Sequence, residues 1–173
     1  MKALRIAAAA AASLAFALAH AQGGPSDPQI AAIVVAANQV DVDAGKLAKS
    51  KSRNKKVKEF AQLMITDHTA VNKQAAALVK KLGVKPEESD TSKSLKTGGK
   101  ESNAKLKGLK GKAFDKAYVD HEVAYHEQVL DAIDKVLIPN AKNAELKALI
   151  EKVRPAIAAH LDHAKMLAAS LGA

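Results

Sequence analysis

Apolar side chains recur at alternating steps of three and four residues along most of the chain, which is the spacing of helices with one buried face. This pattern predicts four long helices, over approximately residues 27–51, 55–82, 112–137 and 143–170. Asp27 and Pro28 suit the start of the first helix, and Gly83 suits the end of the second. Pro155 lies inside the last helix, where it predicts a kink rather than a break because the apolar spacing continues in phase.

The segment between the second and third helices, residues 84–111, is polar and contains Pro86 and several glycines. It is expected to be mostly irregular connection, with at most a short helical turn. Two hairpins with short loops, joined by such a long connection, are typical of a four-helix bundle with a crossover. The predicted fold class is therefore all-α, a four-helix bundle with a long crossover connection between its second and third helices.

A polar residue interrupts each apolar seam once, near the middle of the helix. These residues are Asp41, His68, His126 and His160. In the first helix, alanines permit two registers, and one of them places Asp41 on the buried face. Counting from the first hairpin turn, Asp41 and His68 differ in height by about 6 Å. Counting from the second, His126 and His160 differ by about 8 Å, and Glu122 is closer to the height of His160. These heights permit a single cluster.

Burying such groups is costly unless they satisfy one another, since an unpaired buried polar group costs about 1–3 kcal/mol. Two interpretations stay open. The cluster is either a hydrogen-bonded network that fixes the helix register or a metal site with imidazole and carboxylate ligands. Such ligands suit one zinc, copper or iron ion. The candidate metal ligands are Asp41, His68, Glu122, His126 and His160.

Several other polar and aromatic residues border these seams. His121 and His163 lie off the seams and are expected at the surface, with a supporting role behind the ligands as the alternative. Asp67 borders the core and at best orients a neighbour. Tyr118 and Tyr125 are expected to pack beside the third seam with their hydroxyls at the rim. No glycine-rich phosphate loop and no plausible setting for a nucleophilic serine is present, so no catalytic residue is predicted.

The first residues indicate the compartment. Lys2 and Arg5 precede an apolar run over residues 6–19, and Ala19-His20-Ala21 has the form of a cleavage site. This pattern predicts a cleaved secretory signal over residues 1–21, because the run is shorter than the roughly 20 residues of a spanning helix. An uncleaved anchor is the alternative. Residues 22–173 then form one domain, periplasmic or secreted, with no cysteine for disulfides and no further apolar segment that could cross a membrane.

Basic residues give the chain a formal charge of +9, and removal of the signal would lower it by two. Seven lysines lie between Lys93 and Lys112, against one acidic residue, Glu101. This stretch is expected to be a solvated loop, with weak contact to anionic envelope surfaces as the alternative. It lacks the aromatic platforms and arginine forks of nucleic-acid readers, so no specific nucleic-acid recognition is predicted.

Three stretches carry a resemblance to a known family: KVKEFAQLMITDHTAVN at residues 56–72, FDKAYVDHEVAYHEQVL at 114–130 and IAAHLDHAKML at 157–167. They resemble the bacterial exported ferritin-like domain family of unknown function that is often labelled predicted outer membrane protein. The resemblance implies a ferritin-like four-helix fold, an exported location and no established activity. Asp41 stands where that family usually has a glutamate, and its carboxylate is shorter.

Ferritin-like di-iron proteins use Glu-x-x-His pairs on two of their helices. This chain has no Glu-x-x-His sequence, so one ion is expected rather than two, and ferroxidase chemistry is not predicted. The favoured function is binding or envelope maintenance, with one transition-metal ion in a central Asp/His cluster. A mononuclear metalloenzyme is one alternative. The other is a structural or envelope-interaction protein whose cluster is only a polar network.

Overall fold

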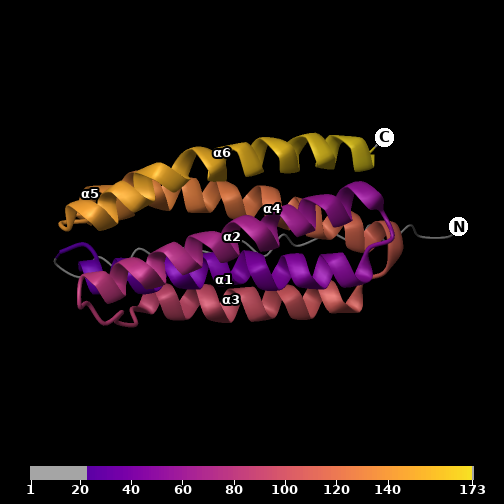
Figure 1. Ribbon diagram of the computed structural model, residues 1–173. Coiled ribbons are helices and arrows are strands. Elements are labelled where there is room, and N and C mark those ends of the chain that lie inside the picture. The colour runs from indigo at the N-terminus through magenta and orange to yellow at the C-terminus, as the bar shows by residue number, and fades with distance from the viewer. Residues whose placement is uncertain (1–22, 173) are drawn as a thin grey trace, which may run out of the picture.

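The structure is a computed structural model that describes residues 23–172 (Figure 1). Its main helices are α1 (Asp27–Lys51), α2 (Lys55–Lys81), α3 (Asp90–Gly108), α4 (Gly111–Ala132) and α6 (Ala144–Gly172). A π-helical turn, η1 (Ile133–Leu137), and the short α5 (Ile138–Asn140) continue α4. The described residues contain no strand, so the predicted all-helical class and its four long helices are confirmed. The predicted signal, residues 1–21, lies outside the described residues.

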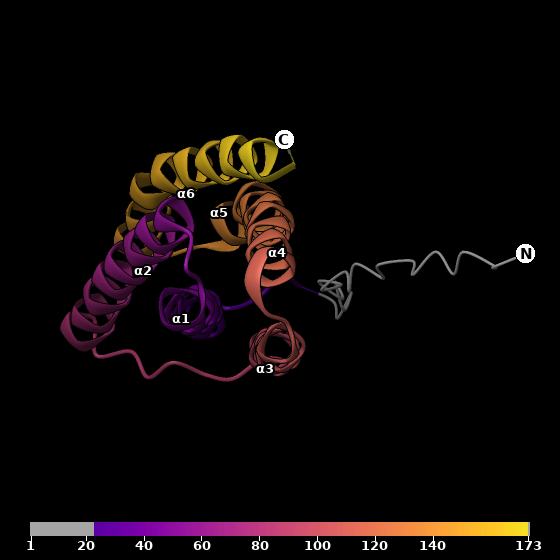
Figure 2. The same ribbon diagram turned by 90° about the vertical axis from the view of Figure 1, so that its right-hand side faces the viewer.

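Helices α1, α2, α4 and α6 pack around a common interior, and α3 lies outside them against α1 (Figure 2). The short loop between α1 and α2 lies at one end of the molecule, and that between α5 and α6 lies at the other (Figure 1). Helix α3 runs the length of α1 between the end of α2 and the start of α4. The result is a helical bundle with one additional helix on its flank.

The segment predicted to be irregular connection is mostly helix α3, so that prediction is wrong. Ser89 caps its start, since the Ser89 hydroxyl accepts a hydrogen bond from the Ser92 amide at 3.2 Å. The buried face of α3 is made of small and apolar residues, including Leu95, Gly99 and Leu106. A Cβ atom at Gly99 would lie 2.7 Å from a methyl group of Val40, so this glycine permits close packing against α1 rather than breaking α3.

Helix α1 is buried on two faces because it lies between α3 and the other helices. Ile30, Val34 and Asp41, which belong to one predicted register, are buried, and so are Ala36 and Val40 on another face of the helix. The predicted ambiguity between two registers therefore reflects a helix that packs on both sides.

Two details of the helix ends and interiors follow from backbone hydrogen bonding. Ser26, not the predicted Asp27, caps α1 in a capping box with Gln29. Asp27 instead accepts hydrogen bonds from the backbone amides of Lys142 and Asn143, both at 2.9 Å. Helix α6 continues through Pro155 as one curved helix, as predicted (Figure 1).

The apolar core is divided into two parts. One contains Ile30, Tyr125 and Ile150, and the other contains Phe60 and Tyr118. On each of the four packed helices, the change from one part to the other occurs at or beside the polar residue that interrupts the seam. Buried polar residues therefore form a belt across the middle of the bundle.

Candidate metal centre

Five buried side chains from four helices meet in this belt. They are Asp41 of α1, His68 of α2, Glu122 and His126 of α4, and His160 of α6, each at most 4 % exposed. One possible ligand atom from each of His68, His126 and His160 lies within 4.8 Å of the others. The same holds for Asp41, Glu122 and His126. All five residues predicted from the sequence are thus brought together, with His126 common to both groups.

The three imidazole rings face one another. The ring centroids of His68 and His160 are 5.3 Å apart, and those of His126 lie 5.6 Å from each of the others. Histidine ligands of a tetrahedral zinc ion bind at about 2.0–2.1 Å, which places their nitrogens roughly 3.3 Å apart. Small movements of the side chains would bring these nitrogens from their present separation to that distance.

A protein oxygen orients each ring through one of its two nitrogens. His68 Nδ1 donates to Oδ1 of Asn38 at 2.8 Å, and the Asn38 amide in turn donates to the Val34 carbonyl at 2.7 Å. His126 Nδ1 donates to the backbone carbonyl of Glu122 at 2.9 Å. His160 Nε2 donates to Oδ2 of Asp67 at 2.9 Å. In each ring the bonded nitrogen carries the proton, and the bond fixes the orientation of the ring and so the position of its other nitrogen.

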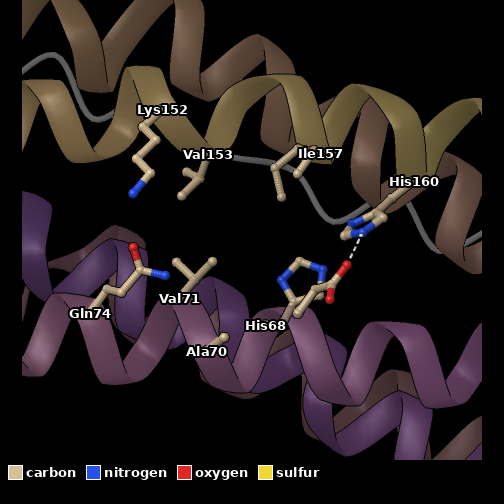
Figure 3. Close-up of a pocket in the computed structure, with 10 residues that line it drawn as sticks. His68, Ala70, Val71, Gln74, Lys152, Val153, Ile157 and His160 are labelled. Atoms are coloured by element: carbon tan, nitrogen blue, oxygen red, sulfur yellow. Dashed lines mark hydrogen bonds and ion pairs between the residues drawn. The ribbon is translucent and has the colours of Figure 1, made fainter.

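The other nitrogens are buried and have no hydrogen-bond partner among the described residues. They are His68 Nε2, His126 Nε2 and His160 Nδ1. Figure 3 shows the rings of His68 and His160 side by side between α2 and α6. A histidine that donates one N–H to an amide, carbonyl or carboxylate oxygen while its other nitrogen is free has the arrangement of a metal ligand.

Burial favours the neutral form of His68 and His126. It lowers the pKa of His126 to about 4, although the hydrogen bond to the Glu122 carbonyl acts in the opposite direction. Burial also lowers the pKa of His68 well below its usual value, and the nearby His126 and His160 add to this effect. Neutral rings are the form that binds a metal ion.

Burial has the opposite effect on the pKa of the two acids in the belt, Asp41 and Glu122, because it disfavours their charged forms. It raises the pKa of Glu122 to about 8. It also raises the pKa of Asp41 well above its usual value, and the charge of Glu122 adds to the shift. Glu122 is therefore mostly protonated at neutral pH in the absence of a cation, and burial favours the protonated form of Asp41. A bound cation would favour their ionised forms and make them available as ligands.

A small cavity of about 40 Å³ borders the α1 side of the centre and is lined in part by Asn38, Asp41 and His68. Its volume is sufficient for one or a few water molecules. The π turn η1 contributes Ile133 and Leu137 to the same cavity. The side chains in the belt could therefore hold one metal ion, with three imidazoles, one or two carboxylates and room for water.

The predictions for the residues that border the seams are confirmed only in part. Asp67 orients His160, as predicted. His163 is exposed, as predicted, and packs against the ring of Phe60 with centroids 5.0 Å apart. His121 is not a surface residue, because α3 covers it: its ring lies 3.3 Å from the Ser102 hydroxyl, and burial lowers its pKa to about 4.

The prediction that the tyrosine hydroxyls lie at the rim is wrong. Tyr118 and Tyr125 are almost completely buried. The Tyr125 hydroxyl donates to the Ala37 carbonyl at 3.0 Å. Burial and the neighbouring Glu122 raise the pKa of Tyr118 well above its usual value, so its hydroxyl stays protonated beside the belt.

Sequence reasoning missed Asn38. It lies three residues before Asp41, so the two side chains share a face of α1, and a polar pair at this spacing in an otherwise apolar helix was the available signal. The alanine-rich sequence of α1 leaves its register ambiguous, so the sequence alone does not decide whether Asn38 is buried or exposed to solvent.

Comparison with known proteins identifies the family of the chain but assigns it no activity. A model described as a domain of unknown function, DUF4142, matches residues 10–167. No curated protein and no solved structure matches the chain. No helix among the described residues is both long and apolar enough to cross a membrane. Since the family model covers most of its length, the chain belongs to the DUF4142 family, a family defined by a domain of unknown function.

Proposed function

We propose that this protein binds one transition-metal ion at the centre of its bundle. His68, His126 and His160 are the nitrogen ligands, and Asp41 and Glu122 supply the carboxylate. The supporting observation is the cluster of three histidines with ligand atoms within 4.8 Å of one another, in which each ring has one nitrogen bonded to a protein oxygen and the other buried without a partner among the described residues. Imidazole and carboxylate ligands suit zinc, copper or iron.

The ferritin-like relationship is part of this proposal. The four packed helices and the helical connection from the end of α2 to the start of α4 support it. The ligand set supports one ion rather than a di-iron pair, because only two carboxylates reach the belt and neither precedes a histidine by three residues. We therefore favour metal binding, for sequestration or delivery, over ferroxidase chemistry.

A polar network without metal is the competing explanation for the belt. It would account for the burial of Asp41 and Glu122, because burial raises the pKa of each and so favours its neutral form. It leaves His68 Nε2, His126 Nε2 and His160 Nδ1 without a hydrogen-bond partner among the described residues, and a buried polar atom that gains no partner costs about 1–3 kcal/mol. This difference favours the metal centre.

Elemental analysis of protein purified without an affinity tag tests the proposal. We expect close to one equivalent of a single metal in the wild type and a strong reduction in His68→Ala and His126→Ala. His163→Ala is the matched control, because it removes an exposed histidine of α6 outside the belt. Helix content by circular dichroism would show that each variant folds. Equal trace metal in all four proteins would refute the metal centre.

Export is the second part of the proposal. The n-region, apolar run and cleavage motif of residues 1–21 support it. Amino-terminal sequencing of the protein from an exporting host should give a mature chain that begins at Gln22. An intact Met1 terminus on protein retained in the cytoplasm would contradict export.

Contact with anionic envelope surfaces is proposed for the lysines of α3 and its flanks. All seven lysines from Lys93 to Lys112 are exposed, while the apolar face of α3 is turned to α1. Binding to vesicles that contain anionic lipid should weaken steeply as salt is raised, because exposed charges are screened within about 10 Å at 0.1 M. Salt-insensitive binding would refute this role of the lysines.

A further inference from the structure

A groove between α2 and α6 leads from the surface to the candidate metal centre. Its volume is about 220 Å³. His68 and His160, both buried, line its inner end, and the exposed residues Gln74 and Lys152 line its outer end. The groove therefore connects the centre with solvent, and its volume suits a small organic molecule.

The two ends are separated by a fixed distance along the helices. Lys152 and His160 are eight residues apart on α6, which corresponds to about 12 Å along the axis. Gln74 follows His68 by six residues on α2, or about 9 Å. Figure 3 shows the Lys152 and Gln74 side chains extending toward one another across the groove, at the end opposite the two histidines.

Apolar side chains line the middle of the groove. They are Val71 of α2 and Val153 and Ile157 of α6. The sequence pattern places all three on the apolar seams, yet Val71 and Val153 are only half-buried. Partly exposed valines on the inner seam of a bundle provide an apolar surface for the body of a ligand.

Lys152 supplies an unneutralised charge at the outer end. It forms no ion pair with any described residue, whereas seven other lysine and arginine side chains pair with an acid. Gln74 adds an amide that can donate a hydrogen bond to the same group. A cation and an amide donor at one end of an apolar groove fit a carboxylate at the end of an aliphatic chain.

We propose that the groove binds a small aliphatic carboxylic acid. Its carboxylate pairs with Lys152 and Gln74, and its chain lies along Val71, Val153 and Ile157. A second polar group at the far end reaches the metal ion held by His68 and His160. This last contact rests on the proposed function, while the contact with Lys152 does not. The ligand would occupy a coordination position that the protein side chains leave open.

Calorimetric titration of the zinc-loaded protein with succinate, adipate, suberate and sebacate tests the match of length. Hexanoate, which lacks the second acid group, is the reference ligand. We expect the affinity to pass through a maximum at adipate or suberate, because shorter acids cannot span the groove and longer ones must fold. Hexanoate should bind more weakly than adipate, since it cannot reach the metal.

Charge reversal tests the outer contact. Lys152→Glu should weaken binding of the best acid at least tenfold, because attraction becomes repulsion at the carboxylate. Lys73→Glu is the matched control: it changes the net charge equally and lies one residue before Gln74, but it does not line the groove. Ala156→Phe, at an exposed alanine in the wall, should obstruct the groove and abolish binding of every acid.

Metal content, measured on the same samples, separates the two proposals. Two results at full metal occupancy would overturn the groove proposal and leave the metal centre intact. One is the absence of saturable binding of the acids, and the other is an equal loss of affinity for the acids in Lys152→Glu and Lys73→Glu. Absence of metal would overturn the metal centre. If the acids still bound in a Lys152-dependent manner without metal, and adipate and hexanoate bound equally, only the contact at the inner end would be refuted.

Discussion

The Asp67 carboxylate accepts a hydrogen bond from Nε2 of His160 at 2.9 Å, and Nδ1 of the same ring is buried with no hydrogen-bond partner among the described residues. The two residues come from α2 and α6, and Asp67 lies next to His68 in the sequence. One turn of α2 therefore supplies both a candidate ligand and the group that orients another.

Loss of the Asp67 carboxylate should weaken metal binding without removing a ligand. Groups that orient a ligand histidine typically contribute a factor of about 10–100 to metal affinity. We expect a loss of that size in Asp67→Ala and a smaller loss in Asp67→Asn, which keeps an acceptor oxygen. Competition with a chromophoric chelator would measure both. Asp162→Ala, an exposed aspartate of α6, should be unchanged, and equal affinity in all variants would contradict the role of Asp67.

Metal binding should release protons. Glu122, with its pKa raised to about 8, is mostly protonated at pH 7, and burial favours the protonated form of Asp41. A bound cation would displace about one proton for each acid that becomes a ligand, so affinity should rise about tenfold per pH unit per proton below pH 8. Calorimetry in buffers of different ionisation enthalpy would count the protons. Metal binding without proton release would exclude Glu122 as a ligand.

The metal-free protein should lose stability above neutral pH. Folded Glu122 keeps its proton up to about pH 8, whereas its usual pKa is 4.5, so the folded state binds the extra proton between these values and the free energy of unfolding falls as pH rises. His126 acts oppositely, because its pKa is about 4 when folded and 6.5 when unfolded. Above pH 6.5 the acid dominates, and stability should fall by on the order of 2 kcal/mol by pH 8.

Denaturation in the presence of a chelator, at several pH values, would measure this fall. Glu122→Gln should flatten it, because the amide does not titrate. Glu127→Gln makes the same change at an exposed position of α4 and should keep the wild-type dependence. Stability that is constant from pH 6.5 to pH 8 in the wild type would show that Glu122 ionises without cost.

The packing of α3 on α1 should depend on Gly99. A methyl group at this position would meet the Val40 side chain at 2.7 Å, so Gly99→Ala should destabilise the protein by about 1–3 kcal/mol through overpacking. Gly108→Ala, at the end of the same helix, has no atom within 4 Å of the new methyl and should be neutral or slightly stabilising. Urea denaturation would compare the two variants. An equally stable Gly99→Ala protein would show that α3 adjusts its position without cost.

Sequence periodicity was sufficient for the helices that pack by large apolar residues. The interruptions at His68, His126 and His160 were visible because each stands alone among aliphatic neighbours at regular spacing. The same reasoning placed Asp41 and Glu122 at compatible heights, and the structure brings all five together. Binding of a metal ion by them stays a prediction.

Helix α3 and its consequences were not predictable by the same means. Its buried face is built from Ser92, Gly99 and two leucines, and small residues carry little periodic signal although they permit close helix packing. If residues 84–111 form a loop, no helix covers His121, and the sequence then predicts that His121 lies at the surface. Asn38 was missed for a related reason, since alanine-rich α1 is buried on two faces and its register was ambiguous.

The polar belt lies where the two apolar parts of the core meet, and every packed helix crosses it once. An ion bound there would join all four helices at mid-height and would bind only the folded form. Its stabilisation, RT ln(1 + [L]/Kd), would therefore be shared by both ends of the molecule. Amide hydrogen exchange should then slow near Phe60 and near Ile150 alike on addition of metal, although neither residue belongs to the belt.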